Sequence, residues 1–456
     1  MAQNNSSGRG SFGSKFGIIA AAAGSAIGLG NIWRFPYVLG ESGGGAFLLV
    51  YLTFILAIGI PVMLSEFAIG RSTRSNPYGA FRKLAPKQPW FVIGIMGIFA
   101  AFMILAFYGA VGGWTLEYLF KSVTGQFSHK TPEQINDLFA SFREDSFRTV
   151  LWQVLFMGIT FLIVMAGIEK GIEKYNKILM PLLLAILIII VVRSVTLPGA
   201  KEGLVFLFKP DFSKLNAGVI FAALGQAFFS LSIGMGALIT YGSYINKKDN
   251  LGNSAFIVSL ADTFIAILAG IAIFPAVFAF GLKPQAGTGL VFQALPNIFQ
   301  QMPGGFFISI LFFVLLTVAA LTSAISLLEV VVATFVEEMN LTRHKASAIA
   351  AILITLLGIP CALSWGSMSW LTIGNNNFFD ILELISTKFI LPIGGFFIVL
   401  FIAWFHGKSN VRDEISSSGQ QKAMFFNVYF FLVRYIVPVA IGLIFLNEMG
   451  ILKLSD

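Results

Sequence analysis

The stretch Ile27-Gly28-Leu29-Gly30, like its counterpart Ile233-Gly234-Met235-Gly236, lies inside a long apolar segment, where a membrane helix would be expected to run unbroken. Glycine in a helix interior costs about 1 kcal/mol relative to alanine, and it permits backbone geometries closed to other residues. In hydrocarbon, a helix opens at mid-depth only where other groups satisfy its backbone. Glycine-interrupted segments at corresponding places in two halves of a chain are typical of a secondary transporter built from inverted repeats. The alternative is that both runs are small-residue seams between packed helices.

The composition is that of a polytopic membrane protein. Of the 456 residues, 57% are hydrophobic and 11% are charged, whereas soluble domains average about 25% charged residues. The net charge of +8 comes from cations that fall in the loops, where they set topology, so no nucleic-acid partner is expected. Cys361 is the only cysteine, which excludes a disulfide within the chain and a cysteine-based metal cluster.

Apolar segments long enough to span a bilayer, about 20 residues each, divide the chain into about eleven spans. We expect them at roughly 14–40, 44–70, 90–120, 149–167, 173–196, 216–245, 253–281, 305–336, 345–364, 376–406 and 424–450. The segment from Leu290 to Met302 is shorter and is expected to form a re-entrant or loop helix, and the polar segment from Lys121 to Arg148 a long external loop.

We expect a protein of the cell inner (plasma) membrane. The distribution of lysine and arginine predicts that its N-terminus lies in the cytoplasm, and the odd number of spans then places its C-terminus outside. Residues 1–13 then form a cytoplasmic segment, 14–200 a first repeat of helices 1–5, and 201–410 a second repeat of helices 6–10. Residues 411–456 supply a cytoplasmic loop and an eleventh helix. The predicted fold class is an all-α membrane protein with an inverted five-plus-five helix repeat and broken first and sixth helices.

Asp262 is the most informative single acid, because it lies within the apolar run Val258-Ser259-Leu260-Ala261-Asp262-Thr263-Phe264. An ionisable residue inside a membrane span is a functional candidate by default. The alternative is an aspartate near a helix end that reaches out to the interface.

The run from Ala23 to Tyr37, followed by Gly43-Gly44-Gly45-Ala46-Phe47, resembles the first helix of the neurotransmitter:sodium symporter family. The runs Gly225 to Gly236 and Ala319 to Ser323 are similar to the family's sixth and eighth helices, and the resemblance extends along essentially the whole chain. It implies a bacterial, eleven-span symporter that imports a hydrophobic or aromatic L-amino acid with sodium by alternating access. The oligomeric state is left open.

The resemblance implies two sodium sites made of oxygen ligands, which suit an alkali cation. One uses the carbonyls of Gly24, Ile27 and Ala319 with the hydroxyls of Thr322 and Ser323. The other uses the Ala26 carbonyl, Asn31, Ser230, Asp262 and the substrate carboxylate. For the two hydroxyls, the alternative is that they bond their own helix backbone. Many family members have asparagine at the position of Asp262 and a chloride-binding serine where Ala266 stands, so chloride independence is expected here.

The substrate site is implied in the same way. The amides of Leu29 and Gly30 and the hydroxyl of Tyr108 would bind the carboxylate, and the carbonyls of Ala26, Phe229 and Ser230, with the region of Ser232, the amine. The side-chain pocket would be lined by Ala22, Ile104, Tyr108, Phe229, Met235, Ser323 and Leu327. A flexible apolar lining accepts medium or large hydrophobic side chains.

Two gates complete the implied mechanism. Outside, Arg34 and Glu383 resemble the family's ion pair, and Asp380 matches a second acid of that helix; inside, Arg9 with Glu337 and Phe12 with Tyr244 resemble the cytoplasmic gate. The interval from Gly171 to Pro181 has the spacing of members whose fifth helix unwinds, although a static proline kink would also explain it. A channel would need repeated subunits or rings of charge, and an intramembrane enzyme a nucleophile–base or metal-ligand set. Neither pattern is found in the sequence.

Overall fold

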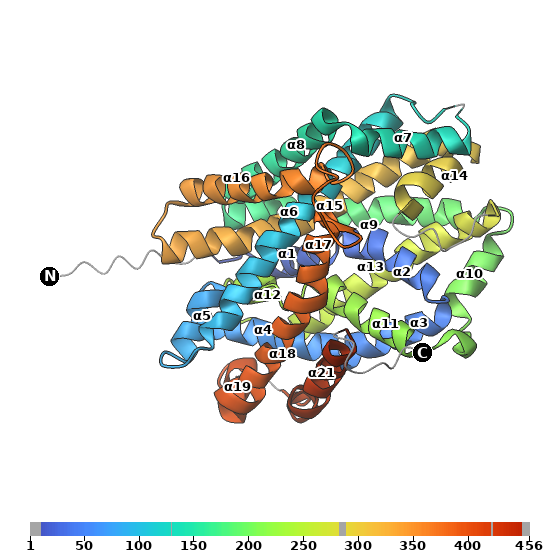
Figure 1. Cartoon of the computed structure of the whole chain (residues 1–456). Helices are drawn as coiled ribbons and strands as arrows, with labels where there is room; N and C mark the ends of the chain where they lie inside the picture. Colours follow the sequence, from blue (N-terminus) through green and yellow to red (C-terminus); the bar gives the residue numbers. More distant parts are fainter. Residues whose placement is uncertain (1–10, 129, 282–288, 421–422, 449–456) are drawn as a thin grey trace.

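The computed structural model describes residues 11–128, 130–281, 289–420 and 423–448, and these are almost entirely helical. Within the described residues, nine helices are long and apolar enough to cross a membrane unbroken. They comprise α3 and α4 (Gly45–Thr73), α6 (Phe91–Val123), α8 (Ser146–Met165), α9 with its preceding turn (Ile168–Val195), α13 (Leu251–Ala279), α15 (Gly305–Glu338), α16 (Arg343–Ala362), α17 and α18 (Phe378–His406), and α20 and α21 (Phe426–Asn447). Figure 1 shows the long helices packed side by side in one bundle.

Two further spans are broken, at the two glycine runs. The first consists of α1 (Lys15–Ala26) and a helix from Gly30 to Glu41 that includes α2 (Phe35–Glu41), bent by 48°. The second consists of α11 (Ala217–Ser230) and α12 (Ala237–Gly242), each too short to cross alone. All eleven predicted spans therefore correspond to helical segments of the described chain.

The break in the first span begins at Ile27, whose φ of −75° and ψ of 105° are extended. In the second span the backbone turns at Ser232, Gly234 and Gly236, with φ of 55°, 83° and 74°. Glycine adopts such angles readily, whereas a serine in this region is uncommon. Glu66 of α4 accepts a hydrogen bond of 2.7 Å from the Gly234 amide, which satisfies a donor freed by the break.

Short helices and one hairpin connect the spans. They are α5 (Pro77–Leu84), α7 (Pro132–Glu144), α10 (Ala200–Phe208), α14 (Leu295–Gln301), α19 (Lys408–Ile415), and the pair β1 (Thr372–Ile373) and β2 (Asn376–Asn377). The polar segment that we expected only as a loop folds in part into α7, because Thr131 and Gln134 form a capping box. The loop helix expected after Leu290 is α14, preceded by a π-helical turn.

The fifth span is not unwound. Ile168–Glu173 forms a π-helical turn, and α9 (Lys174–Val195) continues helically through Pro181. A Cβ on Gly171 would lie 2.1 Å from the Ile163 carbonyl oxygen, so close backbone packing explains this glycine.

A second pair of glycines allows α4 and α12 to pack backbone against backbone. A Cβ on Gly70 would lie 2.0 Å from the carbonyl oxygen of Ile239, and one on Gly242 would lie 2.8 Å from that of Phe67. Since even a methyl group would force the helices apart, the end of the second span and the distal half of the second broken helix form one tightly packed unit.

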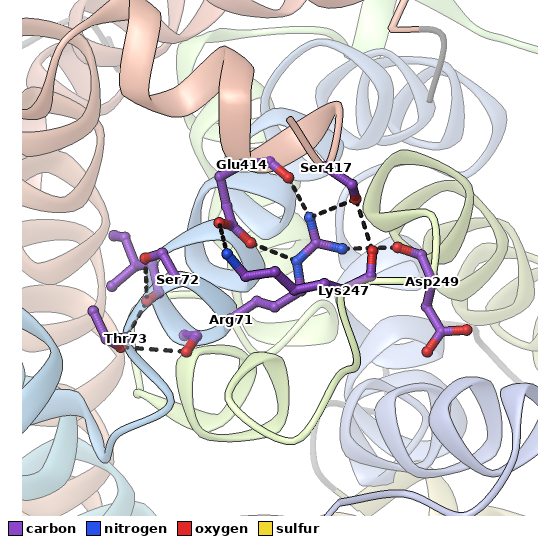
Figure 2. Close-up of polar contacts among 9 residues, drawn as sticks. Arg71, Ser72, Thr73, Lys247, Asp249, Glu414 and Ser417 are labelled. Carbon is purple, nitrogen blue, oxygen red and sulfur yellow. Dashed lines mark hydrogen bonds and ion pairs between the residues drawn. The ribbon is translucent and has the colours of Figure 1, made fainter. Parts of the chain in front are cut away.

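A buried arginine extends this unit to the loop between the last two spans (Figure 2). Arg71, at the end of α4 and 1% exposed, donates from Nε to Glu414 Oε1 at 2.6 Å and from Nη1 to the Asp249 carbonyl at 2.7 Å. Its Nη2 donates to the Glu414 carbonyl and to Ser417 Oγ. Lys247 adds a longer ion pair to Glu414, at 3.6 Å. Three chain segments thus meet around one guanidinium.

We predict that Arg71→Met lowers the free energy of unfolding by about 3–5 kcal/mol, because it leaves the buried Glu414 carboxylate with only the longer ion pair to the exposed Lys247. The double variant Arg71→Met/Glu414→Met should recover much of this loss. A denaturant titration of the detergent-solubilised protein measures both values. Arg82→Met is the matched control, since Arg82 is exposed and bonds only the Tyr78 hydroxyl, at 3.1 Å. A single Arg71 variant as stable as this control would contradict the prediction.

Candidate functional site

The two breaks meet at Asn31, which is fully buried. Its Oδ1 accepts a hydrogen bond of 3.0 Å from the Gly28 amide in the opened turn. Its Nδ2 lies 3.1 Å from Ser230 Oγ, at the end of α11, and 2.7 Å from Asp262 Oδ1, on α13. One side chain therefore joins both broken helices to the seventh span.

Asp262 lies in the interior of α13 and has no exposed surface, so the alternative of an interfacial side chain does not hold. Ser230 Oγ donates to its Oδ2 at 2.8 Å, and Tyr51 OH donates to Ser230 Oγ at 3.3 Å. Within the described chain, no lysine, arginine or histidine forms an ion pair with this carboxylate. A buried carboxylate with neutral donors and no cationic partner is costly unless a cation or a proton joins it.

A second cluster of oxygens lies between the first break and α15. Thr322 Oγ1 is 3.2 Å from the Ile27 carbonyl oxygen and 3.0 Å from that of Ala319. Ser323 Oγ is 3.3 Å from the Ser25 carbonyl oxygen and 3.5 Å from that of Ile27. Thr322 thus bonds the backbone of its own helix, as the alternative interpretation expects, but its hydroxyl also contacts the Ile27 carbonyl of the first broken helix. Gly24 and Ala26 are buried in the last turn of α1.

The residues expected around a substrate are brought to the same region. Tyr108 OH accepts a hydrogen bond of 3.2 Å from the Leu29 amide, and a Cβ on Gly28 would lie 2.9 Å from this hydroxyl. A Cβ on Gly30 would lie 3.1 Å from the ring of Phe229, and Ser232 Oγ donates to the Ser25 carbonyl at 2.9 Å. The remaining expected lining residues are all buried: Ala22, Ile104, Met235 and Leu327.

The Arg34–Glu383 ion pair expected for the outer gate is not formed in the described structure. Arg34 instead donates to Gln226 Oε1 at 2.7 Å and lies over the Phe229 ring, 4.8 Å from its centroid. Gln226 also donates from Nε2 to the Gly30 carbonyl at 2.9 Å. The sequence reasoning missed Gln226, although a glutamine within the apolar run 217–230 was a signal for it.

The second outer acid, Asp380, forms a capping box with Asn377 at the start of α17. Its Oδ2 accepts from the Asn377 amide at 3.2 Å, and its own amide donates to Asn377 Oδ1 at 3.0 Å. In this structure Asp380 therefore helps to cap the N-terminus of α17.

Among the residues expected for the cytoplasmic gate, the Phe12 ring lies edge-on to that of Tyr244, with centroids 5.9 Å apart. Tyr244 OH donates to Glu329 Oε1 at 2.7 Å, and Glu329 pairs with Arg343 at 2.5 Å, two residues that the sequence reasoning did not single out. Glu337 accepts a hydrogen bond of 2.9 Å from the Asn76 amide. Its expected partner Arg9 lies outside the described residues.

Two broken helices joined through buried side chains, with clusters of oxygen atoms beside the breaks, are the arrangement expected of a multi-span secondary transporter. The chain belongs to the Sodium:neurotransmitter symporter family, whose pattern matches residues 9–141 and 134–455. It is therefore a sodium-dependent transporter and not an enzyme.

Relatives cover nearly the whole chain. An uncharacterised sodium-dependent transporter of Bacillus subtilis is 43% identical over 96% of this chain and 98% of its own length, and one of Methanocaldococcus jannaschii is 32% identical over 97% and 91%. The crystal structure of MhsT in complex with L-phenylalanine is similar with a TM-score of 0.90 and 50% identity, covering 96% of this chain and 99% of that one.

Proposed function

We propose that this protein imports a hydrophobic or aromatic L-amino acid together with sodium by alternating access, without a need for chloride. The observation that carries the proposal is the buried Asn31–Ser230–Asp262 cluster, which joins the two opened backbones and holds a carboxylate without a cationic side-chain partner. The similarity to MhsT, a protein solved with L-phenylalanine, supports the substrate class.

Two sodium ions would bind at the two oxygen clusters. The cluster of Gly24, Ile27, Ala319, Thr322 and Ser323 offers only neutral carbonyl and hydroxyl oxygens. The cluster of Ala26, Asn31, Ser230 and Asp262 adds a carboxylate, and the substrate carboxylate would complete it. A substrate that supplies a ligand to the ion binds more tightly when the ion is present, which is the coupling that symport requires.

The substrate carboxylate would lie at the opened turn of the first span. The amides of Leu29 and Gly30 start the helix that continues to Glu41, and a helix N-terminus favours an anion. Tyr108 OH, which now accepts from the Leu29 amide, has a proton to donate to that carboxylate. The amine would meet carbonyls near Ala26, Phe229 and Ser230, and the apolar side chain would contact Ala22, Ile104, Met235 and Leu327.

Alternating access would proceed between the repeats proposed at 14–200 and 201–410, with the N-terminus in the cytoplasm and the C-terminus outside. The edge-on contact between Phe12 and Tyr244 supports a closed cytoplasmic side. Outside, Arg34 bound to Gln226 and stacked over Phe229 would exchange Gln226 for Glu383 as the outer path closes. Gates of this kind need only bias two states that differ by a few kcal/mol.

Uptake of L-phenylalanine into proteoliposomes should require an inward sodium gradient and should saturate with substrate. The reason is that Asp262 and the neighbouring oxygens need a cation to offset their buried charge. Uptake that continues at the same rate when choline or potassium replaces sodium, with no proton gradient, would contradict the proposal.

Replacing chloride by gluconate should leave the uptake rate unchanged, because Asp262 supplies a fixed negative charge and Ala266 carries no hydroxyl. Asp262→Asn combined with Ala266→Ser should make transport chloride-dependent, and Asp262→Asn alone is the matched control. Strong chloride dependence of the unmodified protein would refute the charge argument.

The glycines at the breaks should tolerate no side chain. A Cβ on Gly28 would lie 2.1 Å from Ser323 Oγ, and Gly234, at φ +83°, would place one 2.6 Å from the Leu391 carbonyl oxygen. We expect Gly28→Ala and Gly234→Ala to weaken L-phenylalanine binding at least about tenfold, or about 1.4 kcal/mol. A scintillation-proximity titration measures this loss. Gly225→Ala is the control, since a Cβ there meets nothing within 4 Å, and equal binding by all three variants would refute the prediction.

A further inference from the structure

At the start of the fifth span, the residue just before α9 is a buried glutamate, Glu173, and both of its carboxylate oxygens have partners. Glu173 accepts from the Gly13 amide at 2.7 Å and from Ser14 Oγ at 3.0 Å, and it pairs with Lys177 at 2.5 Å. A Cβ on Gly17 would lie 2.0 Å from Glu173 Oε1, so this side chain lies directly against the α1 backbone. The start of the first span is thereby tied to the fifth span.

Asn176, about one turn later in the fifth span, differs from Glu173 because one of its polar side-chain atoms lacks a hydrogen-bond partner among the described residues. The side chain has no exposed surface. Its Nδ2 donates to the Ile172 carbonyl at 3.0 Å, which fixes the orientation of the amide. Its Oδ1 has no hydrogen-bond partner among the described residues. Leaving a buried acceptor unsatisfied costs free energy, so a water, an ion or another donor is expected beside this atom.

The free Oδ1 lies against the last turn of α1, just before the first break. A Cβ built on Gly24 would lie 2.4 Å from it, so the amide oxygen lies against the Gly24 backbone. The carbonyl of the next residue, Ser25, accepts a hydrogen bond from Ser323 Oγ. The Ile27 carbonyl accepts one from Thr322 Oγ1. Asn176 therefore packs against Gly24, whose carbonyl is one of the oxygens proposed for the neutral cluster, and it does so from the fifth span.

We propose that Asn176 Oδ1 is a further ligand of the cation bound at this cluster, either directly or through one water. The inference rests on the proposed function, in which sodium binds between α1 and α15. The cluster itself offers carbonyls and hydroxyls but no carboxylate, so an added amide oxygen strengthens a site for a hard cation. The requirement for glycine at position 24 follows, since a Cβ there would push this oxygen away.

This ligand gives the fifth span a direct connection to sodium. Asn176 follows Glu173 by three residues in the fifth span; both side chains contact α1, and Glu173 holds its start. A cation held by Asn176, α1 and α15 would fasten the three helices at one point. Its loss would remove one polar connection between α9 and α1 at that depth, while the contact made by Glu173 would remain.

The test compares the sodium dependence of L-phenylalanine binding in the purified full-length protein. Asn176→Leu keeps the approximate size of the side chain and removes its oxygen. We expect it to raise the half-saturating sodium concentration about fivefold, the effect of losing one ordinary hydrogen bond. Asn176→Asp keeps an oxygen and adds charge, and it should bind sodium at least as tightly as the wild type.

Gln153→Leu is the matched control. Gln153 is also a fully buried amide whose Oε1 lacks a described partner, and its Nε2 donates to the Thr355 carbonyl at 3.3 Å, between α8 and α16. Its replacement should leave the sodium curve where it is. Should Asn176→Leu not purify as a folded protein, Asn176→Ala, which only shortens the side chain, takes its place.

The outcomes separate this inference from the proposed function. A sodium curve of Asn176→Leu that superimposes on the wild-type curve would overturn the inference and leave sodium coupling intact. Equal impairment of the Leu and Asp variants would also overturn it, because the lost bond to Ile172 would then explain both. Wild-type binding that does not depend on sodium would overturn the proposed function itself.

Discussion

The structure depends on one constraint, which is that two helices opened in the middle of a membrane must find hydrogen-bond partners for their backbones. Side chains from other spans provide them. Glu66 accepts a hydrogen bond from the Gly234 amide, and the Tyr108 hydroxyl accepts one from the Leu29 amide. The Thr322 hydroxyl donates one to the Ile27 carbonyl. The side chains that satisfy the opened backbones are therefore neighbours of the groups proposed to bind sodium and substrate. The same contacts would then contribute to both stability and binding.

The sequence predicted the spans well because their signal is local. A run of apolar residues is recognisable without knowledge of its neighbours, and each of the eleven expected segments corresponds to helix in the described chain. The glycine breaks were also predictable, since the backbone angles at Gly234 and Gly236 are ones that glycine adopts readily. Helix α7 was missed because its polar composition concealed an ordinary capping box at Thr131.

Side-chain partners were harder to predict, because they join segments that are far apart in the chain. The burial of Asp262 follows from the apolar run around it, but its bond to Asn31 spans 231 positions. The sequence suggested Glu383 as the partner of Arg34, whereas in the structure the Arg34 guanidinium donates to the amide oxygen of Gln226. Asn176 carried no signal in the sequence, since an asparagine near a helix start is ordinary until its oxygen is found buried and unpartnered.

The guanidinium of Arg71 has a consequence for biosynthesis. Its carboxylate partner, Glu414, is 343 residues further along the chain, so a ribosome completes most of the protein before the two can meet. In the meantime Arg71 is an unpaired cation at the end of the second span, where, in the proposed orientation, positive charge keeps a loop in the cytoplasm. The same residue would then serve twice, first as a topology signal during insertion and later as the buried centre on which the last loop closes.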